Sequence, residues 1–316
     1  MWRGVDTNFS ILRVIDAKIR ELHALNGEYL PDFGSSPSLF VGSDYSGEHK
    51  ESQYLGFTFI FLPVESWRNW DRSRQAARRK HCIEDGRRFG YAKMNDPRKR
   101  VATGELLEAL TEQRGLLVSL SVRKVLKSVF DTSGQLDRSS WGVEHCVGWA
   151  NADLEKMLRV VHTVAFFTAG IASGGQNVRW ITDHDNIAAN EQRFQQMAVV
   201  FRNVLDQYLS VRLNSVSCST TFGSPLEVED FAAIPDLVGG AIVELFTAHA
   251  RNGHDISEAT FPRPDKLPLK THEILDSLAQ PGHLRRVFYK VEPGPALGTI
   301  EIADINIAAP LPTRGV

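Results

Sequence analysis

A nine-residue apolar run at Tyr54–Leu62 is the feature that most limits how this chain can fold. It reads Tyr-Leu-Gly-Phe-Thr-Phe-Ile-Phe-Leu, so aromatic and aliphatic side chains occupy nearly every position. A strand that is exposed on one face alternates apolar and polar residues, whereas a strand that is covered on both faces is apolar throughout. The run therefore predicts a central strand of a sheet with both of its faces buried.

The remaining elements can be placed around such a sheet. Apolar residues at helical spacing predict helices over residues 10–25, 63–81, 104–113, 153–169, 187–209 and 235–248. Apolar or alternating runs predict strands over residues 39–43, 116–122, 177–182 and 215–220, and a hairpin over 286–305. Residues 86–101 suggest a loop with strand character.

This order of elements predicts an α/β fold in which helices flank a mixed sheet, with an extra N-terminal helix and a C-terminal β-hairpin. We expect an N-terminal helix and linker in residues 1–37, a core domain in 38–250 and a C-terminal extension in 251–316. The two terminal parts lie outside the expected core. They are therefore candidates for joining copies of the chain into a homo-oligomer.

Composition is typical of a soluble globular protein, with 42% hydrophobic and 23% charged residues among 316. The three cysteines are widely spaced and form no CxxC pair, which gives no indication of a disulfide framework or a structural zinc site. The start of the chain has no apolar signal core. The longest apolar stretch, near Val160–Ala172, is shorter than the roughly 18 residues that span a membrane. We therefore expect a cytoplasmic protein that does not contact membranes.

Positive charge is concentrated between Arg68 and Arg100. This segment holds twelve Lys and Arg residues against four Asp and Glu, although the whole chain has a net charge of −2. Such a segment can bind the phosphate backbone of DNA or RNA, or it can be a solvated helix face followed by a basic loop. The candidates for phosphate contact are Arg72, Arg78, Arg79, Arg87, Arg88, Arg98 and Arg100.

Three aspartates occupy positions at which distant parts of a chain can meet. Asp44 and Asp183 each follow a predicted strand, and Asp236 follows Pro235 at the expected start of an apolar helix. Mg²⁺ and Mn²⁺ favour oxygen ligands, and enzymes that cleave phosphodiesters hold such ions with carboxylates on rigid elements. The three residues therefore predict a metal site, provided that the fold brings them together.

Each aspartate also has a purely structural interpretation. Asp44 could open a turn, Asp183 or Asp185 could cap the helix expected from Ile187, and Asp236 could interact with a helix dipole in the first turn. Taken singly, these interpretations are favoured. Taken together within this order of elements, a metal site is favoured.

Four segments resemble a known family. They are Val41–Gly47, Phe89–Met94, Trp180–Asp185 and Ile234–Ala241. They are similar to a strand that ends in an acidic motif, a segment that carries a lysine, a second acidic strand end, and an Asp-Leu motif on the last core helix. With the order of elements, they resemble the RNase H-like fold, which has a five-stranded mixed sheet, and more narrowly the family named domain of unknown function 3800.

The resemblance implies a metal-dependent nuclease that hydrolyses phosphodiester bonds of DNA or RNA with Mg²⁺ or Mn²⁺. Asp44, Asp183 and Asp236 would be its metal ligands and catalytic residues. Lys93 would orient the scissile phosphate or neutralise developing charge, unless it is simply a solvated lysine in a basic loop.

One departure from the family pattern bears on catalysis. Tyr45 stands where the family carries a second acid, and Glu48, Glu51 or Asp185 would have to replace it. This leaves three alternatives open: a one-metal site, a rearranged site, or a catalytically incomplete protein that binds nucleic acid or acts as a scaffold.

Overall fold

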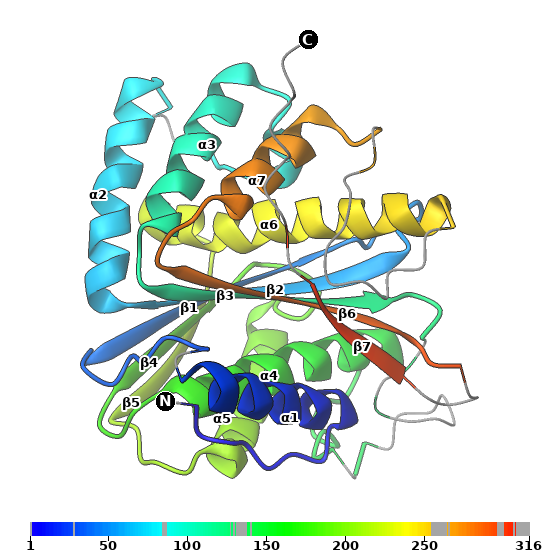
Figure 1. Ribbon diagram of the computed structural model, residues 1–316. Coiled ribbons are helices and arrows are strands. Elements are labelled where there is room, and N and C mark those ends of the chain that lie inside the picture. The colour runs from blue at the N-terminus through cyan, green and yellow to red at the C-terminus, as the bar shows by residue number, and fades with distance from the viewer. Residues whose placement is uncertain are drawn as a thin grey trace.

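The computed structural model shows one seven-stranded sheet between two layers of helices (Figure 1). It describes residues 2–27, 29–83, 87–126, 128, 130, 138–139, 141–253, 264, 266–295, 300–305 and 307. The strand order is β5-β4-β1-β2-β3-β6-β7. The strands are β1 (Ser38–Ser46), β2 (Tyr54–Pro63), β3 (Gly115–Arg123), β4 (Asn177–Thr182), β5 (Ser215–Thr220), β6 (Leu284–Pro293) and β7 (Ile300–Ile305). The α/β class with a mixed sheet is confirmed.

Helices cover both faces of the sheet (Figure 1). One face carries α2 (Val64–Lys80), α3 (Pro97–Thr111), α6 (Leu226–Arg251) and α7 (Leu269–Ala279). The other face carries α1 (Ser10–Asn26), α4 (Asn151–Ile171) and α5 (Glu191–Tyr208). A short 3₁₀ helix, η1, covers Tyr91–Lys93. The apolar side of α1 is buried within the chain's own core, so assembly of copies through α1 stays a prediction.

The central position of β2 explains its apolar sequence. Phe57, Phe59 and Phe61 point into the core beneath α1, α4 and α5. Ile60 and Leu62 point into the core shared with α2, α3, α6 and α7. Alternate residues of a strand point to opposite faces, so a strand between two helical layers needs apolar side chains at every position.

Parallel pairing brings the C-terminal ends of three strands to one edge of the sheet. β1 pairs in parallel with β4, and β4 in parallel with β5. In this register Ser43 lies opposite Thr182, which lies opposite Thr220. The residues that follow these positions must therefore be neighbours in space.

The sheet has seven strands where five were expected, because the C-terminal hairpin continues it. β6 pairs in parallel with β3 along Leu284–Val291, and β7 pairs antiparallel with β6. The hairpin itself was expected from the sequence. The pairing of this hairpin with β3 was not expected. It joins residues more than 160 positions apart, and a local sequence pattern cannot predict such a contact.

The segment expected to be a loop with strand character over residues 86–101 is helical in its second half. α3 begins at Pro97, and the Asp96 side chain accepts hydrogen bonds from the backbone N–H groups of Arg98 and Lys99. Asp followed by Pro is a favourable start for a helix, since proline lacks only an N–H that would have no partner there. The strand character expected there was therefore wrong, whereas residues 87–90 and 94–96 lie outside helices and strands, as expected of a loop.

The helix expected from Pro235 begins nine residues earlier, at Leu226. Pro235 lies inside α6 and removes one backbone hydrogen bond there, but the helix continues because its residues are buried over the sheet. By length and composition α6 is apolar enough to cross a membrane, yet 78% of its most apolar window is buried inside the protein. The apolar residues of α6 thus pack mainly in the interior of the protein.

Candidate active site

Asp44 and Asp183 lie at the ends of adjacent parallel strands. Asp44 is within β1, opposite Thr58 of β2, and Asp183 directly follows β4. The Asp183 N–H donates to the Ser43 carbonyl at 3.1 Å, which extends the pairing of the two strands to the aspartates. The Asp183 carboxylate accepts a hydrogen bond from Thr221 Oγ1 at 2.8 Å. The expected convergence of these two strand ends is therefore present.

Asp236 reaches the same edge from α6. Even-numbered residues of β1 face this helix, since a Cβ added at Gly42 would meet Phe231 of α6 at 3.0 Å. One turn after Asp236, a Cβ at Gly239 would lie 2.7 Å from Thr58 Oγ1, the residue paired with Asp44. Only glycine permits this close approach of helix and sheet. The Asp-Leu-Val-Gly sequence thus sets the height of Asp236 above the strand that carries Asp44.

The structural interpretations of the three aspartates do not hold. Asp44 belongs to a strand rather than a turn. α5 begins at Glu191, and its N-cap is Asn190, whose side chain accepts from the Arg193 N–H. Asp236 lies in the third turn of α6, too far from its start for the dipole to favour a charge there.

The electrostatics of Asp44 are those of a buried charge among like charges. It is 8% exposed, and its carboxylate forms no hydrogen bond or ion pair with any residue that the structure describes. Burial raises the pKa of Asp44 well above its usual value, and repulsion from Asp236, Asp183 and Asp185 adds to the rise. The Lys156 charge opposes this rise, and a further cation close to Asp44 would oppose it more strongly.

Asp236, unlike Asp44, accepts a hydrogen bond within the described structure. Burial and the Asp183 carboxylate raise the pKa of Asp236, although its Oδ2 accepts from the Tyr91 N–H at 2.9 Å. Lys93 of η1 opposes this rise through its charge. A Cβ at Gly90 would lie 2.8 Å from Asp236 Oδ2, so the turn before η1 packs directly on the carboxylate.

The donor set suits a hard divalent cation, because carboxylate oxygens are the ligands that Mg²⁺ and Mn²⁺ prefer and a cation would relieve the repulsion at Asp44. Within the described part of the chain, however, no three His, Cys, Asp or Glu side chains are grouped closely enough to hold a metal ion as they stand. The fold therefore brings the elements together, but the carboxylates do not form a ready ligand cage.

Asp185 and Glu48, two of the acids expected to replace the missing one and hence further candidate metal ligands, form ion pairs with a lysine that the sequence did not single out. Lys156 of α4 donates to both carboxylates, and its side chain is only 12% exposed. Burial alone would lower the pKa of Lys156, but Asp185 and Glu48 together raise it above its usual value. One inward-facing lysine in an amphipathic helix resembles a solvated one in sequence, so no local signal marked it.

Tyr45 points to the opposite face of the sheet from Asp44, as consecutive strand residues must. Its hydroxyl shares hydrogen bonds with Ser43 at 3.0 Å and Thr182 at 2.7 Å. The Lys156 ammonium lies 5.0 Å from the centre of its ring. Tyr45 is therefore a packed residue beneath Lys156 and does not replace the missing acid. Glu51 is exposed and pairs with His49, so it does not replace it either.

A cavity of about 290 Å³ opens beside Asp236. Tyr91 connects its walls, because its N–H bonds Asp236 and its hydroxyl bonds Glu244 and Thr271 on α6 and α7. Glu244 lies two turns after Asp236 and was not identified from the sequence. Of the three aspartates, Asp236 is the one that lines this cavity, together with Glu244.

The seven candidate arginines have different environments. Arg78 is 3% exposed and, with Arg74, clamps the fully buried carboxylate of Asp230 on α6. It therefore packs α2 on α6 and is not accessible to a phosphate. Arg88 and Arg100 pair with Glu229 and Glu273. Arg88 is nevertheless exposed, as are Arg72, Arg79, Arg87 and Arg98.

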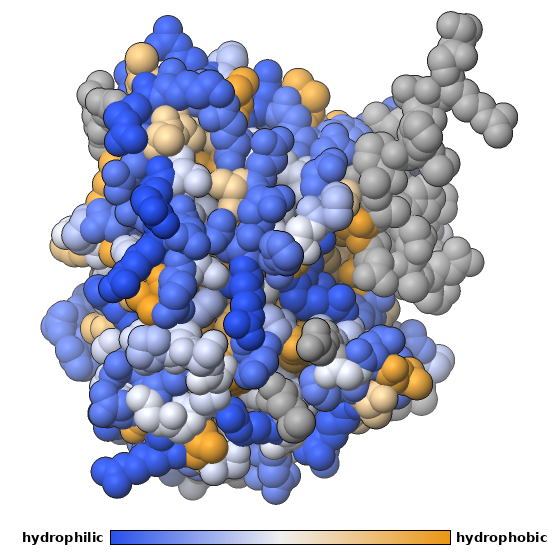
Figure 2. Space-filling view, turned by 60° about the vertical axis from the view of Figure 1, so that its left-hand side comes forward, coloured by the Kyte–Doolittle hydropathy of each residue, from blue (hydrophilic) through white to orange (hydrophobic). Residues whose placement is uncertain are grey.

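The surface on the side of α2 is largely hydrophilic, and its apolar side chains are scattered rather than joined (Figure 2). The chain matches no protein-family model and no curated protein sequence. The resemblance to the RNase H-like fold thus remains one of sequence motifs and of the order of elements.

Proposed function

We propose that this protein is a metal-dependent nuclease of the RNase H-like type that uses Mg²⁺ or Mn²⁺ to hydrolyse DNA or RNA. The observation that carries the proposal is the environment of Asp44. The Asp44 carboxylate is buried, has no hydrogen bond within the described residues and lies near Asp183 and Asp236. Such a group lowers the stability of the folded protein when no ligand is bound. Such perturbed groups are concentrated at functional sites.

The arrangement of the sheet supports the same proposal. β5, β4, β1, β2 and β3 are contiguous in the seven-stranded sheet, and this mixed sheet supports the proposal at the level of the α/β class. β6 and β7 extend it beyond β3, away from the strands that carry Asp44 and Asp183.

The proposed roles follow from position. Asp44, Asp183 and Asp236 would hold the metal ion, which when bound would act as a Lewis acid toward a phosphate oxygen. Lys93, exposed beside Asp236, would hold the scissile phosphate in place. Lys156 already neutralises two further carboxylates, so the proposed centre has one metal ion and one fixed ammonium group.

Nucleic acid would lie across residues 87–98, because Tyr91 of this segment contacts Asp236 and the segment carries Arg87 and Arg98. Contacts of this kind to phosphates position a substrate without reading its sequence. We therefore expect binding to weaken steeply as salt concentration rises. Cytoplasmic location and the absence of membrane contact remain predictions that suit such a substrate.

The test compares the wild type with the double variant Asp44→Asn/Asp183→Asn on labelled single-stranded DNA, duplex DNA and RNA, with Mn²⁺, Mg²⁺ or EDTA. Asp206→Asn is the matched control, since Asp206 is exposed on α5. We expect cleavage only with metal, a loss of at least about 100-fold in the double variant and no loss in the control. Equal cleavage by all three proteins would refute the assignment.

A second candidate function is binding without cleavage. It is favoured by the absence of a grouped ligand set in the described residues and by the Lys156 ammonium among the acids. Mn²⁺ titration by calorimetry separates the two. Nucleic-acid binding with no Mn²⁺ binding and no cleavage would support the binding protein, whereas Mn²⁺ binding that the double variant lacks would support the nuclease.

A further inference from the structure

Two aromatic rings lie together at the edge of the candidate active site. They belong to His184 and Phe222, each of which is two residues beyond the end of a strand: β4 ends at Thr182 and β5 at Thr220. These two threonines pair in the parallel register of the strands, which explains why the residues two positions later meet. The ring centres are 4.9 Å apart, and the ring planes are inclined by 30°.

The Phe222 side chain is largely in solvent. It is 74% exposed, and among the residues that the structure describes it is the one exposed Phe, Tyr or Trp. His184 is also exposed, so the contact between the rings buries little of Phe222. A fixed aromatic ring with most of its surface in water is the kind of surface on which the bases of single-stranded nucleic acids stack.

The turn that carries Phe222 is fixed by hydrogen bonds. Ser224 donates through its N–H to the Thr221 carbonyl at 3.2 Å and through its hydroxyl to the Thr220 carbonyl at 2.7 Å. Gly223 has a φ of +65°, a conformation that favours glycine. Phe222 is therefore held at a defined position, and a ring that is already ordered loses less entropy when a ligand binds to it.

Thr221 connects this turn to the proposed metal ligands. Its N–H donates to the Thr182 carbonyl at 3.2 Å, and its hydroxyl donates to the Asp183 carboxylate at 2.8 Å and accepts from the His184 N–H at 3.3 Å. β5 is two strands from β1, which corresponds to about 10 Å at the usual spacing of strands. Phe222 is thus within reach of a nucleotide close to the scissile phosphate.

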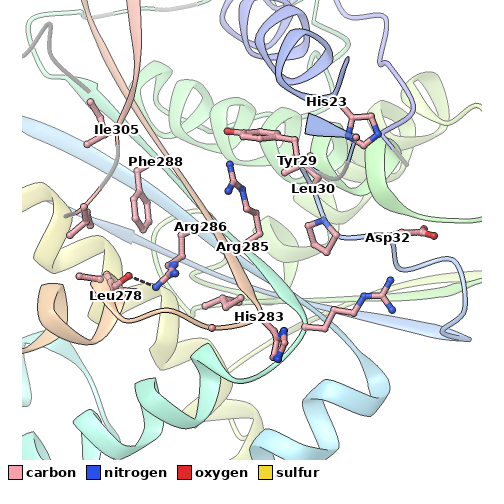
Figure 3. Close-up of a pocket in the computed structure, with 17 residues that line it drawn as sticks. His23, Tyr29, Leu30, Asp32, Leu278, His283, Arg285, Arg286, Phe288 and Ile305 are labelled. Carbon is pink, nitrogen blue, oxygen red and sulfur yellow. Dashed lines mark hydrogen bonds between the residues drawn. The ribbon is translucent and has the colours of Figure 1, made fainter. Parts of the chain in front are cut away.

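By contrast, positive charges in a larger cavity, of about 660 Å³, are engaged within the protein (Figure 3). The Arg285 guanidinium lies over the Tyr29 ring, 4.0 Å from its centre. Arg286 points to another wall, where it donates to the Leu278 carbonyl (Figure 3). This cavity lies beside the starts of β3 and β6, at the end of the sheet opposite to Asp44. It is therefore remote from the path of a nucleic acid that crosses the three aspartates.

We propose that Phe222 stacks on a base of single-stranded DNA or RNA, and that the substrate of the proposed nuclease is therefore a single strand. Inside a duplex both faces of a base are covered by its neighbours, so a ring reaches a base only where the strand is open. His184 lies against one side of the Phe222 ring and leaves the remainder for a base. The path of the strand rests on the proposed function, whereas stacking itself requires no cleavage.

Fluorescence anisotropy of labelled oligonucleotides in EDTA and low salt tests the proposal without cleavage. The probes are an oligothymidylate of about 15 nucleotides, an abasic strand of the same length and a duplex of the same length. The wild type should bind the oligothymidylate at least about tenfold more tightly than the abasic strand, which has the same phosphates but no bases, and more tightly than the duplex. An abasic strand or a duplex that binds as tightly as the oligothymidylate would overturn the proposal, as would failure of the oligothymidylate to bind.

Variants locate the contact. Phe222→Ala should weaken binding of the oligothymidylate about tenfold and leave binding of the abasic strand unchanged, whereas Phe222→Trp, which keeps a ring, should bind like the wild type. Leu25→Ala is the matched control, because Leu25 is 71% exposed on α1, and α1 contacts β7 at the edge of the sheet opposite to β5. Equal affinity of Phe222→Ala and the wild type for the oligothymidylate would show that Phe222 does not contact a base.

Cleavage assays separate this inference from the proposed function. If Phe222→Ala loses binding as expected but the wild type cuts no strand with Mn²⁺, the nuclease assignment fails and the stacking assignment stands. If the wild type cuts single strands and duplexes equally and Phe222→Ala cuts like the wild type, the nuclease assignment stands and the preference for single strands is refuted.

Discussion

Acid should destabilise this protein through one buried histidine, His162 of α4. The ring is 4% exposed, its Nδ1 shares a hydrogen bond of 2.6 Å with the Tyr208 hydroxyl, and its buried Nε2 has no partner among the described residues. Phe130 and Trp141 lie against it. Burial lowers the pKa of His162 from 6.5 to about 3. Protonation would place an unpaired charge among aromatic rings.

The sign and size of the effect follow from the two pKa values. The unfolded chain takes up the proton near pH 6.5 and the folded chain only near pH 3, so stability is present above 6.5 and is lost as pH falls toward 3. At one pKa unit per roughly 1.4 kcal/mol, the loss is about 2 kcal/mol at pH 5 and about 5 kcal/mol once both forms are protonated.

Urea denaturation followed by tryptophan fluorescence, at pH about 7.5 and about 5, measures this loss. His162→Asn cannot become charged there and leaves an acceptor near the position of Nδ1. The variant should have a lower free energy of unfolding than the wild type at the higher pH. Between the two pH values the wild type should lose about 2 kcal/mol more than the variant. His145→Asn, at an exposed histidine, is the matched control and should keep the wild-type dependence. A gap between wild type and His162→Asn that stays constant within about 0.5 kcal/mol would refute the reasoning.

Four further substitutions test helix packing and the buried charges. Gly239→Ala should cost about 1–3 kcal/mol in urea denaturation, because its Cβ would lie 2.7 Å from Thr58 Oγ1, whereas Gly104→Ala, with open space around it, should stabilise α3 by about 0.5–1 kcal/mol. Asp230→Asn should lower the free energy of unfolding by about 3–5 kcal/mol, since it leaves the buried Arg78 without its anion and Arg74 with Asp71 alone; an unchanged urea midpoint would contradict this. Lys156→Met should lower the free energy of unfolding by about 3 kcal/mol in EDTA. Added Mn²⁺ should raise the melting temperature of this variant more than that of the wild type in a thermal-shift assay. An equal rise in both proteins would argue against a cation taking the place of the ammonium group.

Local sequence determined much of this protein. The apolar run at Tyr54–Leu62 specified a doubly covered strand, and helical and alternating patterns located most other elements within a few residues. The order of strands and helices also placed Asp44 and Asp183 at strand ends, and adjacent parallel strands put such ends at one edge of the sheet. These conclusions hold because backbone geometry has a fixed period and direction, so a residue's position in its own element decides where its side chain points.

Only the tertiary structure decided the remainder, because it depends on contacts between residues far apart in the chain. β6 pairs with β3, and α6 extends past Pro235, since burial outweighs the local cost of a proline. Lys156 meets two carboxylates from other elements, and Arg78 is buried against α6 rather than facing a phosphate. A charged side chain has the same local sequence signature whether it faces water, a counter-ion or a ligand. The sequence therefore placed the aspartates, and the fold decided which charges surround them.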